Sequence, residues 1–198
     1  MTSLIKTAVI DTCSLSNFLR YYIFDRGQET EENYEVLFNF FIEKIKKKEL
    51  IVIDKVIVEL LNYDDPEGIF KYFATRISKL VTNTDNCTDI VKSLYKDYEE
   101  TIKSNLSKKT DNEEEKSRQI SKYQSRDADL YLVAYCIELN QLDKTILITD
   151  ENSRQSPGFP KIPNICKDKG IMCDNLPNLI FKHYNSEITF KITKSDSV

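Results

Sequence analysis

The sequence is poor in the residues that build histidine-based or cysteine-based sites. It has one histidine, His183, among 198 residues, so a histidine zinc site or a Ser-His-Asp triad would depend on that single late residue. The five cysteines form no CxxC pair and are expected to be reduced thiols: Cys13, Cys87, Cys136, Cys166 and Cys173. Cys166 and Cys173 could meet across a turn. Any metal chemistry is therefore expected to use oxygen ligands.

An excess of basic residues is also missing. Lysine and arginine total 28 and aspartate and glutamate total 32, which gives a net charge of −4. This balance argues against a broad basic surface that coats duplex nucleic acid, although it leaves a local basic groove open. No apolar run approaches the roughly 20 residues needed to span a bilayer, and residues 1–6 lack the features of a signal peptide. We expect a cytoplasmic protein with no membrane partner.

What the sequence does contain favours an α/β fold. Hydrophobic residues make up 40% of the chain, enough for one core, and we expect a single domain over residues 1–198. Apolar segments predict short strands at 4–10, 50–53, 145–149 and 171–173, and an edge strand at 188–192. Helical spacing predicts helices between them, at 31–47, 55–62, 125–139, 164–169 and 176–183. Strands that alternate with helices predict a mostly parallel sheet covered on both faces.

Local signals set further expectations. Residues 12–16 are expected to form a turn, and Asp54 and Ser125 are placed to cap the helices that follow them. Residues 66–122 predict a helical insertion. Within it, residues 107–116 are polar throughout and predict a mobile loop, or alternatively an acidic flap that competes with nucleic acid.

Acidic residues stand where an open α/β sheet places its working groups, at the carboxyl ends of strands. Asp11 ends the first predicted strand, and Asp150 and Glu151 follow a later one. Asp127 and Asp129 lie in the first turns of a helix that is apolar nearly all round. All of them converge if these strands are neighbours.

Glu59 is unusual because it lies in the apolar helix segment 56–61. A buried carboxylate without a partner would cost several kcal/mol, and a metal ion would supply a partner. Carboxylates gathered in one pocket raise each other's pKa unless a cation neutralises them. Oxygen ligands without histidine favour Mg²⁺ or Mn²⁺ over zinc.

Each acid also has a purely structural interpretation. Asp11 can form an Asx turn after its strand, and Asp127 can complement a helix dipole. The combination of several carboxylates is what favours a metal site.

The ordered motifs resemble the PIN-domain nuclease family. Ala8-Val9-Ile10-Asp11-Thr12-Cys13-Ser14 resembles its opening strand and first acid, and Val56-Ile57-Val58-Glu59-Leu60 its second acidic helix. Asp129-Leu130-Tyr131-Leu132-Val133-Ala134 resembles its third acid, and Ile148-Thr149-Asp150-Glu151 its fourth element. Segments Lys161–Cys166 and Gly170-Ile171 are similar to a bacterial PIN-like subgroup related to the toxin ribonucleases of toxin-antitoxin systems. The resemblance covers about residues 5–182.

The resemblance implies a three-layer α/β/α PIN-like fold and Mg²⁺- or Mn²⁺-dependent hydrolysis of single-stranded RNA. It assigns the catalytic and metal-binding roles to Asp11, Glu59, Asp129 and, by its spacing after the threonine, Glu151 rather than Asp150. Supporting positions around these ligands would be Thr12, Ser14, Asp127 and Asp150. Candidate phosphate-binding residues are Lys161, Lys167 and Lys169. The implied partners are RNA and, for a toxin, a cognate antitoxin protein, with a homodimer as a further expectation.

Two alternatives remain open at this point. A haloacid-dehalogenase-like phosphatase also begins with an apolar strand and an aspartate, but it needs a second aspartate where this chain has Cys13. A non-catalytic PIN scaffold that binds RNA or a partner protein would not need the full set of acids. The helical insertion before Asp129 and the Asp150-Glu151 doublet are departures from the smallest toxin members.

Overall fold

Four parallel strands form the centre of the fold in the computed structural model, which describes residues 7–20, 31–66, 68–125, 128–139, 144–152 and 159–184. The strands are β1 (Thr7–Ile10), β2 (Leu50–Ile51), β3 (Thr145–Ile148) and β4 (Met172–Asp174). Their order in the sheet is β2-β1-β3-β4. Ile10 pairs with Ile148, which pairs with Asp174, so the carboxyl ends of three strands lie side by side.

The two central strands are buried because their residues are apolar on both sides. Val9 and Ile10 in β1 and Leu147 and Ile148 in β3 have no exposed surface. Continuous runs of this kind are typical of parallel strands covered on both faces. The predicted edge strand at 188–192 lies outside the described residues.

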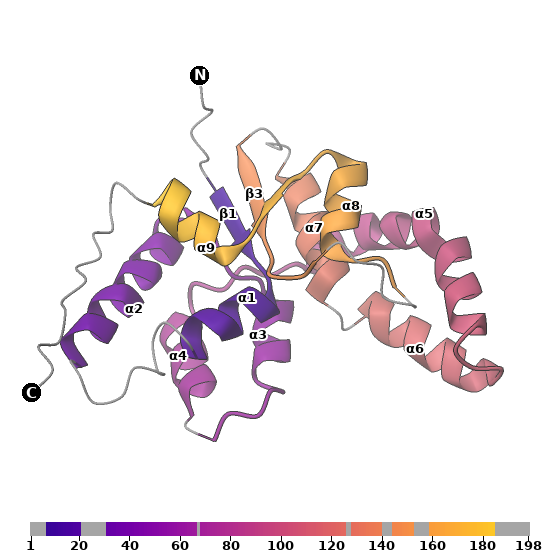
Figure 1. The fold of residues 1–198 in the computed structure, drawn as a ribbon, viewed down its shortest axis with the longest axis horizontal. Helices are drawn as coiled ribbons and strands as arrows, with labels where there is room; N and C mark the ends of the chain where they lie inside the picture. Colours follow the sequence, from indigo (N-terminus) through magenta and orange to yellow (C-terminus); the bar gives the residue numbers. More distant parts are fainter. Residues whose placement is uncertain are drawn as a thin grey trace, which may run out of the picture.

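Helices flank the sheet on both sides (Figure 1). They are α1 (Thr12–Asn17), α2 (Glu31–Lys46), α3 (Asp54–Leu60), α4 (Ile69–Ile77), η2 (Asp85–Cys87), α5 (Thr88–Ser107), α6 (Glu113–Ser125), α7 (Ala128–Glu138), α8 (Ile162–Lys169), α9 (Leu176–Asn178) and η3 (Leu179–His183). Figure 1 shows α2 and α9 on the left of the strands and α7, α8 and α5 on the right. The protein is therefore a three-layer α/β/α protein, which confirms the predicted fold class.

Helix α7 is the centre of the core on one side of the sheet. Its buried side chains include Leu130, Leu132 and Val133, none of which is exposed. It packs against β1 and β3, and α3, α5 and α8 contact it in turn. This burial on all sides explains why its sequence is apolar nearly all round.

Helix α5 of the helical insertion packs against α7 and is also linked to α8 by polar side chains. The Tyr98 hydroxyl donates to the Asp168 carboxylate at 3.0 Å, and Lys169 Nζ lies 2.5 Å from Asp97 Oδ2. α5 also packs on α6, and Figure 1 shows both helices on the right-hand side.

Two predictions about turns and loops are wrong. Residues 12–16 form most of α1 rather than a turn, because Asp11 caps this helix directly after β1. Glu113–Lys116 form the first turn of α6, so the polar loop between the helices is shorter than the predicted 107–116. Asn112 Oδ1 accepts from the backbone N–H groups of Glu114 and Glu115, and the acidic first turn suits the positive helix N-terminus.

Two predicted helix caps are also wrong. Asp54 is the first residue of α3 rather than its cap, and its carboxylate accepts from the Thr84 hydroxyl at 2.6 Å. Ser125 is helical and belongs to α6, and α7 is described from Ala128 onward, residues 126–127 lying outside the described residues.

A search of the described residues found no helix long and apolar enough to cross a membrane.

Candidate acidic site at the carboxyl edge of the sheet

The carboxyl ends of β1 and β3 meet at a topological switch point. The chain passes from β1 to β2 on one side and later enters β3 on the other side of β1. In parallel α/β sheets, ligands bind in the crevice that such a reversal creates. The acidic site, as we call Asp11, Glu59, Asp129, Asp150 and Glu151, is built around this edge.

Asp11 is fixed by hydrogen bonds from two segments. Its backbone N–H donates to the Ile148 carbonyl at 3.0 Å, which extends the pairing of β1 with β3 by one residue. Its Oδ1 accepts from the Ser14 N–H at 2.7 Å, and its Oδ2 accepts from the Thr149 hydroxyl at 2.5 Å. Asp11 thus caps α1 and joins it to the end of β3.

The Asp11 carboxylate is electrostatically unfavourable when it is ionised. It is 3% exposed, and this burial raises its pKa from 3.8 to about 6 even though Thr149 and Ser14 donate hydrogen bonds to it. The negative charge of Asp150 raises the pKa further. A cation at this position would relieve both effects.

The two acids after β3 have different partners. Asp150 Oδ2 accepts from Asn17 Nδ2 at 3.0 Å, and its Oδ1 accepts from the Leu176 N–H at 3.2 Å. Glu151 Oε1 lies 2.5 Å from Lys161 Nζ. Asp150 therefore joins α1 to α9, whereas Glu151 is paired with the residue that precedes α8.

Glu59 connects three helices. Its Oε2 accepts from the Thr12 hydroxyl at 2.6 Å, and its Oε1 accepts from the Ala128 N–H at 2.8 Å. These donors belong to the first residues of α1 and α7. These two donors are the hydrogen-bond partners that a carboxylate in an apolar stretch of sequence requires. Each oxygen of Glu59 keeps a second lone pair.

Asp129 lies in the first turn of α7 and is half-buried. The pKa of Tyr63 is raised mainly by burial and that of Lys161 mainly by its hydrogen bond with Glu151, and the negative charge of Asp129 adds to both effects. Asp127, the predicted supporting acid, lies outside the described residues.

Cys13 shows that several of these acids converge. Burial, together with the charges of Asp11, Asp150 and Glu151, raises the pKa of its thiol to about 11, while Lys161 lowers it. Charged groups that follow β1, follow β3 and precede α8 thus act on one half-buried thiol. Cys13 is a free thiol, as expected, but its position beside the acids could not be predicted from its neighbours in the sequence.

Two features bear on a divalent cation at this position. All the acids offer hard oxygen donors, the ligands that Mg²⁺ prefers. Within the residues that the structure describes, however, no three carboxylate, thiol or imidazole groups are arranged to hold one ion by themselves. The set fits Mg²⁺, which is commonly bound by one or two carboxylates together with water and substrate phosphate.

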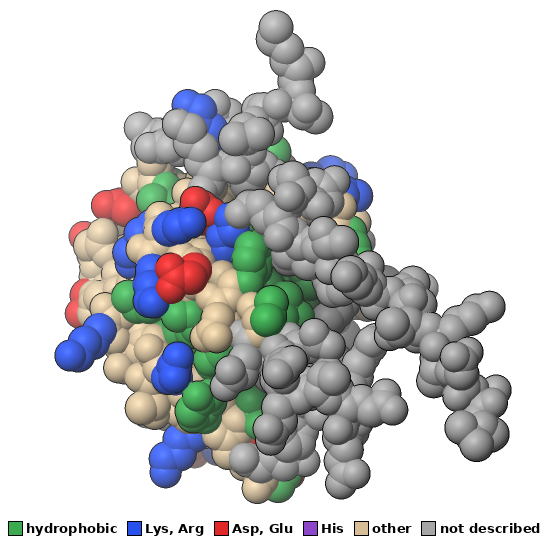
Figure 2. All heavy atoms as spheres, turned by 90° about the vertical axis from the view of Figure 1, so that its left-hand side faces the viewer, with side chains coloured by type: hydrophobic (Ala, Val, Ile, Leu, Met, Phe, Trp, Pro, Cys, Tyr) green, Lys and Arg blue, Asp and Glu red, His purple; other side chains and the backbone are tan. Residues whose placement is uncertain are grey.

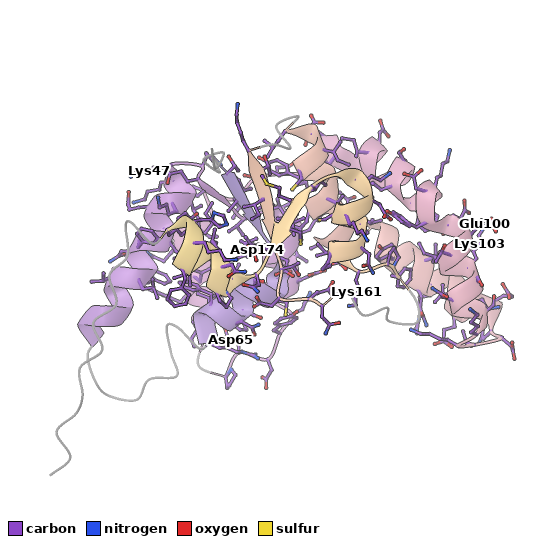
Figure 3. The ribbon with its side chains drawn as sticks, turned by 45° about the horizontal axis from the view of Figure 1, so that its top comes forward. Lys47, Asp65, Glu100, Lys103, Lys161 and Asp174 are labelled. Atoms are coloured by element: carbon purple, nitrogen blue, oxygen red, sulfur yellow. The ribbon has the colours of Figure 1, made fainter. Side chains whose placement is uncertain are left out.

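The three predicted phosphate-binding lysines are not equivalent. Lys161 lies at the acidic site through its contact with Glu151. Lys167 is exposed on α8, and Lys169 is paired with Asp97 of the insertion. In Figure 3, Lys161 and Asp174 lie in the central part of the molecule, whereas Glu100 and Lys103 of α5 lie toward one end.

Three residues of the site were missed by sequence reasoning. Asn17 contacts Asp150, Thr149 contacts Asp11, and Tyr63 lies near several acids. Thr149 could have been found as the residue directly after a buried strand. Asn17 and Tyr63 carried no signal, because their roles depend on segments distant in the sequence.

Comparison with known proteins gives a family but no activity. A family model described as a domain of unknown function, DUF4411, matches residues 9–186. No curated protein and no solved structure matches the chain.

Proposed function

The chain belongs to the DUF4411 family of unknown function, and we propose from its acidic site that it is a Mg²⁺-dependent endoribonuclease that cleaves single-stranded RNA. Asp11, Asp129 and Glu59 are the proposed metal-binding acids, with Glu151 assisting directly or through water. Since no three of the described acids are arranged to hold one ion by themselves, water would complete the contacts of these acids with the ion. Mn²⁺ would serve in place of Mg²⁺. The activity is expected in the cytoplasm.

One observation carries the proposal: acids from distant segments surround the switch point, and the most buried of them has a raised pKa. Besides burial, the pKa of the Cys13 thiol is raised by the charges of Asp11, Asp150 and Glu151. The pKa of the Tyr63 hydroxyl is likewise raised by burial and by the charges of Asp11, Glu59 and Asp129. A set of like charges is unstable by itself and favours binding of a cation. The resemblance to PIN domains, which rests on the same acids, supports this interpretation.

The ion, when bound, would activate a water molecule and offset negative charge on the phosphate. The residues of the chain itself position the acids. Thr149 and the Ser14 N–H orient Asp11, and Thr12 and the Ala128 N–H orient Glu59. Asn17 holds Asp150.

Lys161 is the proposed phosphate-positioning residue. Its ammonium group pairs with Glu151 and also faces Asp129, which raises its pKa and keeps it charged. Figure 2 shows the side that carries α2, where described basic side chains are interspersed with acidic and apolar ones rather than gathered in one surface. A local cation within the acidic site is consistent with the net charge of −4.

The experiment is cleavage of a labelled single-stranded RNA with Mg²⁺, with Mn²⁺ and with EDTA. We expect cleavage that EDTA abolishes and that falls at least about 100-fold in Asp11→Asn and Asp129→Asn. Asp89→Asn is the matched control, because Asp89 is an exposed acid of α5 that pairs with Lys92. Cleavage that persists in EDTA and in both site variants would overturn the proposal.

A second candidate is a non-catalytic scaffold that binds RNA. The pairing of Glu151 with Lys161 favours it, because this ammonium already neutralises one of the proposed metal-binding acids. Binding of RNA without cleavage under any metal condition would select this function. A toxin role, with an antitoxin partner, predicts growth arrest on expression that Asp11→Asn relieves.

A further inference from the structure

An exposed aromatic side chain lies at the edge of the acidic site. Tyr63 follows α3, one helical turn beyond Glu59, and its N–H donates to the Leu60 carbonyl at 3.2 Å. Tyr63 is 41% exposed. An exposed tyrosine ring beside charged groups is a surface on which a planar ligand can stack.

The Tyr63 ring is held in place by a buried aromatic neighbour. It packs edge-on against the fully buried Phe70, with ring centroids 6.3 Å apart. Arg20 contacts the same Phe70 ring, its guanidinium carbon 4.9 Å from the centroid. Arg20 Nη2 also donates to the Asp64 carbonyl at 2.7 Å, directly after Tyr63.

Arg20 and Tyr63 are therefore neighbours, one cationic and one aromatic. Arg20 is exposed, and its guanidinium has five N–H donors. Glu59 lies at the end of α3, four residues before Tyr63, which places the ring at the edge of the acidic site. Burial raises the pKa of Tyr63, and the charges of Glu59, Asp11 and Asp129 add to this effect.

We propose that Tyr63 and Arg20 form a nucleotide-binding subsite in which the Tyr63 ring stacks on one base of single-stranded RNA and Arg20 contacts the adjoining phosphate. This subsite rests on the proposed function and names how its substrate is held. The faces of paired bases are covered by their neighbours in a duplex, whereas an unpaired base can turn its face to the ring. The subsite therefore selects single-stranded over double-stranded RNA.

Binding is measured in EDTA, where the proposed cleavage stops, by fluorescence anisotropy of a labelled 12-nucleotide single-stranded RNA. We expect Tyr63→Ala to weaken binding about 5- to 150-fold, the range for loss of one stacked base. Tyr63→Phe, which keeps the ring, is expected to bind like the unchanged protein. Tyr72→Ala is the matched control, since Tyr72 is 55% exposed on α4 and contacts Phe38 and Arg76.

The stacked base is identified with RNAs that lack one base at successive positions. One such RNA is expected to bind the unchanged protein less tightly, while Tyr63→Ala binds it as well as the intact RNA. Arg20→Met is expected to reduce the slope of log affinity against log salt by about 0.7, the value for one phosphate of a single strand. Tyr63→Ala is expected to leave this slope unchanged.

The outcomes separate the subsite from the proposed function. If the protein cleaves RNA but Tyr63→Ala and Tyr72→Ala bind alike, the subsite is wrong and the nuclease stands. Equal losses in Tyr63→Ala and Tyr63→Phe would also overturn stacking. If the unchanged protein neither binds nor cleaves RNA, both proposals fail.

Discussion

The Asp11 carboxylate combines deep burial with a position among other acids. Because its pKa is about 6 in the folded protein and 3.8 is the ordinary value, the folded state binds more protons than the unfolded state between these pH values. The free energy of unfolding should therefore fall as pH rises from about 4 to about 6. A shift of two pKa units corresponds to about 3 kcal/mol.

The first prediction concerns Asp11→Asn. This variant cannot titrate, so its stability in EDTA should lack this decline, although its amide keeps only one of the two oxygens that accept from Ser14 and Thr149. Urea unfolding at pH 4.5 and pH 7 measures the change in stability of each protein between the two pH values. Equal dependence on pH in the two proteins would contradict the raised pKa of Asp11.

Thr149 is a second residue whose role is local and testable. Its hydroxyl donates to Asp11, and its oxygen accepts from the Glu151 N–H at 3.1 Å. Thr149→Val keeps the shape but leaves both groups without this partner, which should lower stability by about 1–3 kcal/mol. Thr149→Ser keeps the hydroxyl and should restore most of the loss in thermal unfolding. A valine variant as stable as the unchanged protein would show that these two hydrogen bonds do not stabilise the fold.

At the scale of elements, the start of α7 is stabilised from outside its own sequence. The Ala128 N–H donates to Glu59, which lies 69 residues earlier in the chain. Ser125 had been predicted to cap this helix because serine is a frequent cap. The contact that stabilises the helix start is tertiary, so local sequence could not reveal it.

This contact gives the third prediction. Glu59→Ala removes the acceptor for Ala128 and Thr12, and stability should fall by about 1–3 kcal/mol. Amide hydrogen exchange at Ala128 should become faster, while the relative exchange rates of the amides within α4 should stay the same. Glu59→Gln, which retains one acceptor oxygen, should show a smaller effect. Unchanged exchange at Ala128 in the alanine variant would show that this hydrogen bond does not stabilise the helix start.

The strands and most helices could be predicted because burial imposes a pattern on each of them. β1 and β3 are continuous apolar runs, and α2 has an apolar stripe. The turn at 12–16 and the loop at 107–116 were predicted wrongly because helix-capping residues determine where helices begin in those segments. Asp11 begins one helix and Asn112 begins the other. Polar residues with little to bury can therefore still be helical.

At the scale of the whole molecule, the buried side chains form one cluster that runs from β1 to η3 and on to Tyr184. α7 contributes Leu132, which is not exposed. The fourth prediction is that Leu132→Ala lowers the free energy of unfolding by about 2–5 kcal/mol, the usual range for such a truncation. Unfolding should remain one transition when followed by circular dichroism and by tyrosine fluorescence. Two separated transitions would contradict a single-domain protein.

The candidate site was predictable in its members but not in their contacts. Asp11, Asp150 and Glu151 could be selected because the ends of parallel strands share one edge. The pairing of Glu151 with Lys161 and of Asp150 with Asn17 depends on loop and helix positions that the strand pattern does not specify. The position of Tyr63 beside the acids depends in the same way on how α3 packs.

The hydrogen bond between Asp11 and Thr149 spans 138 residues. A ribosome releases Asp11 long before Thr149 and the acids that follow β3. A nascent chain is thus unable to assemble the acidic edge until β3 and the loop after it have left the ribosome, and any activity of this edge begins only after that point.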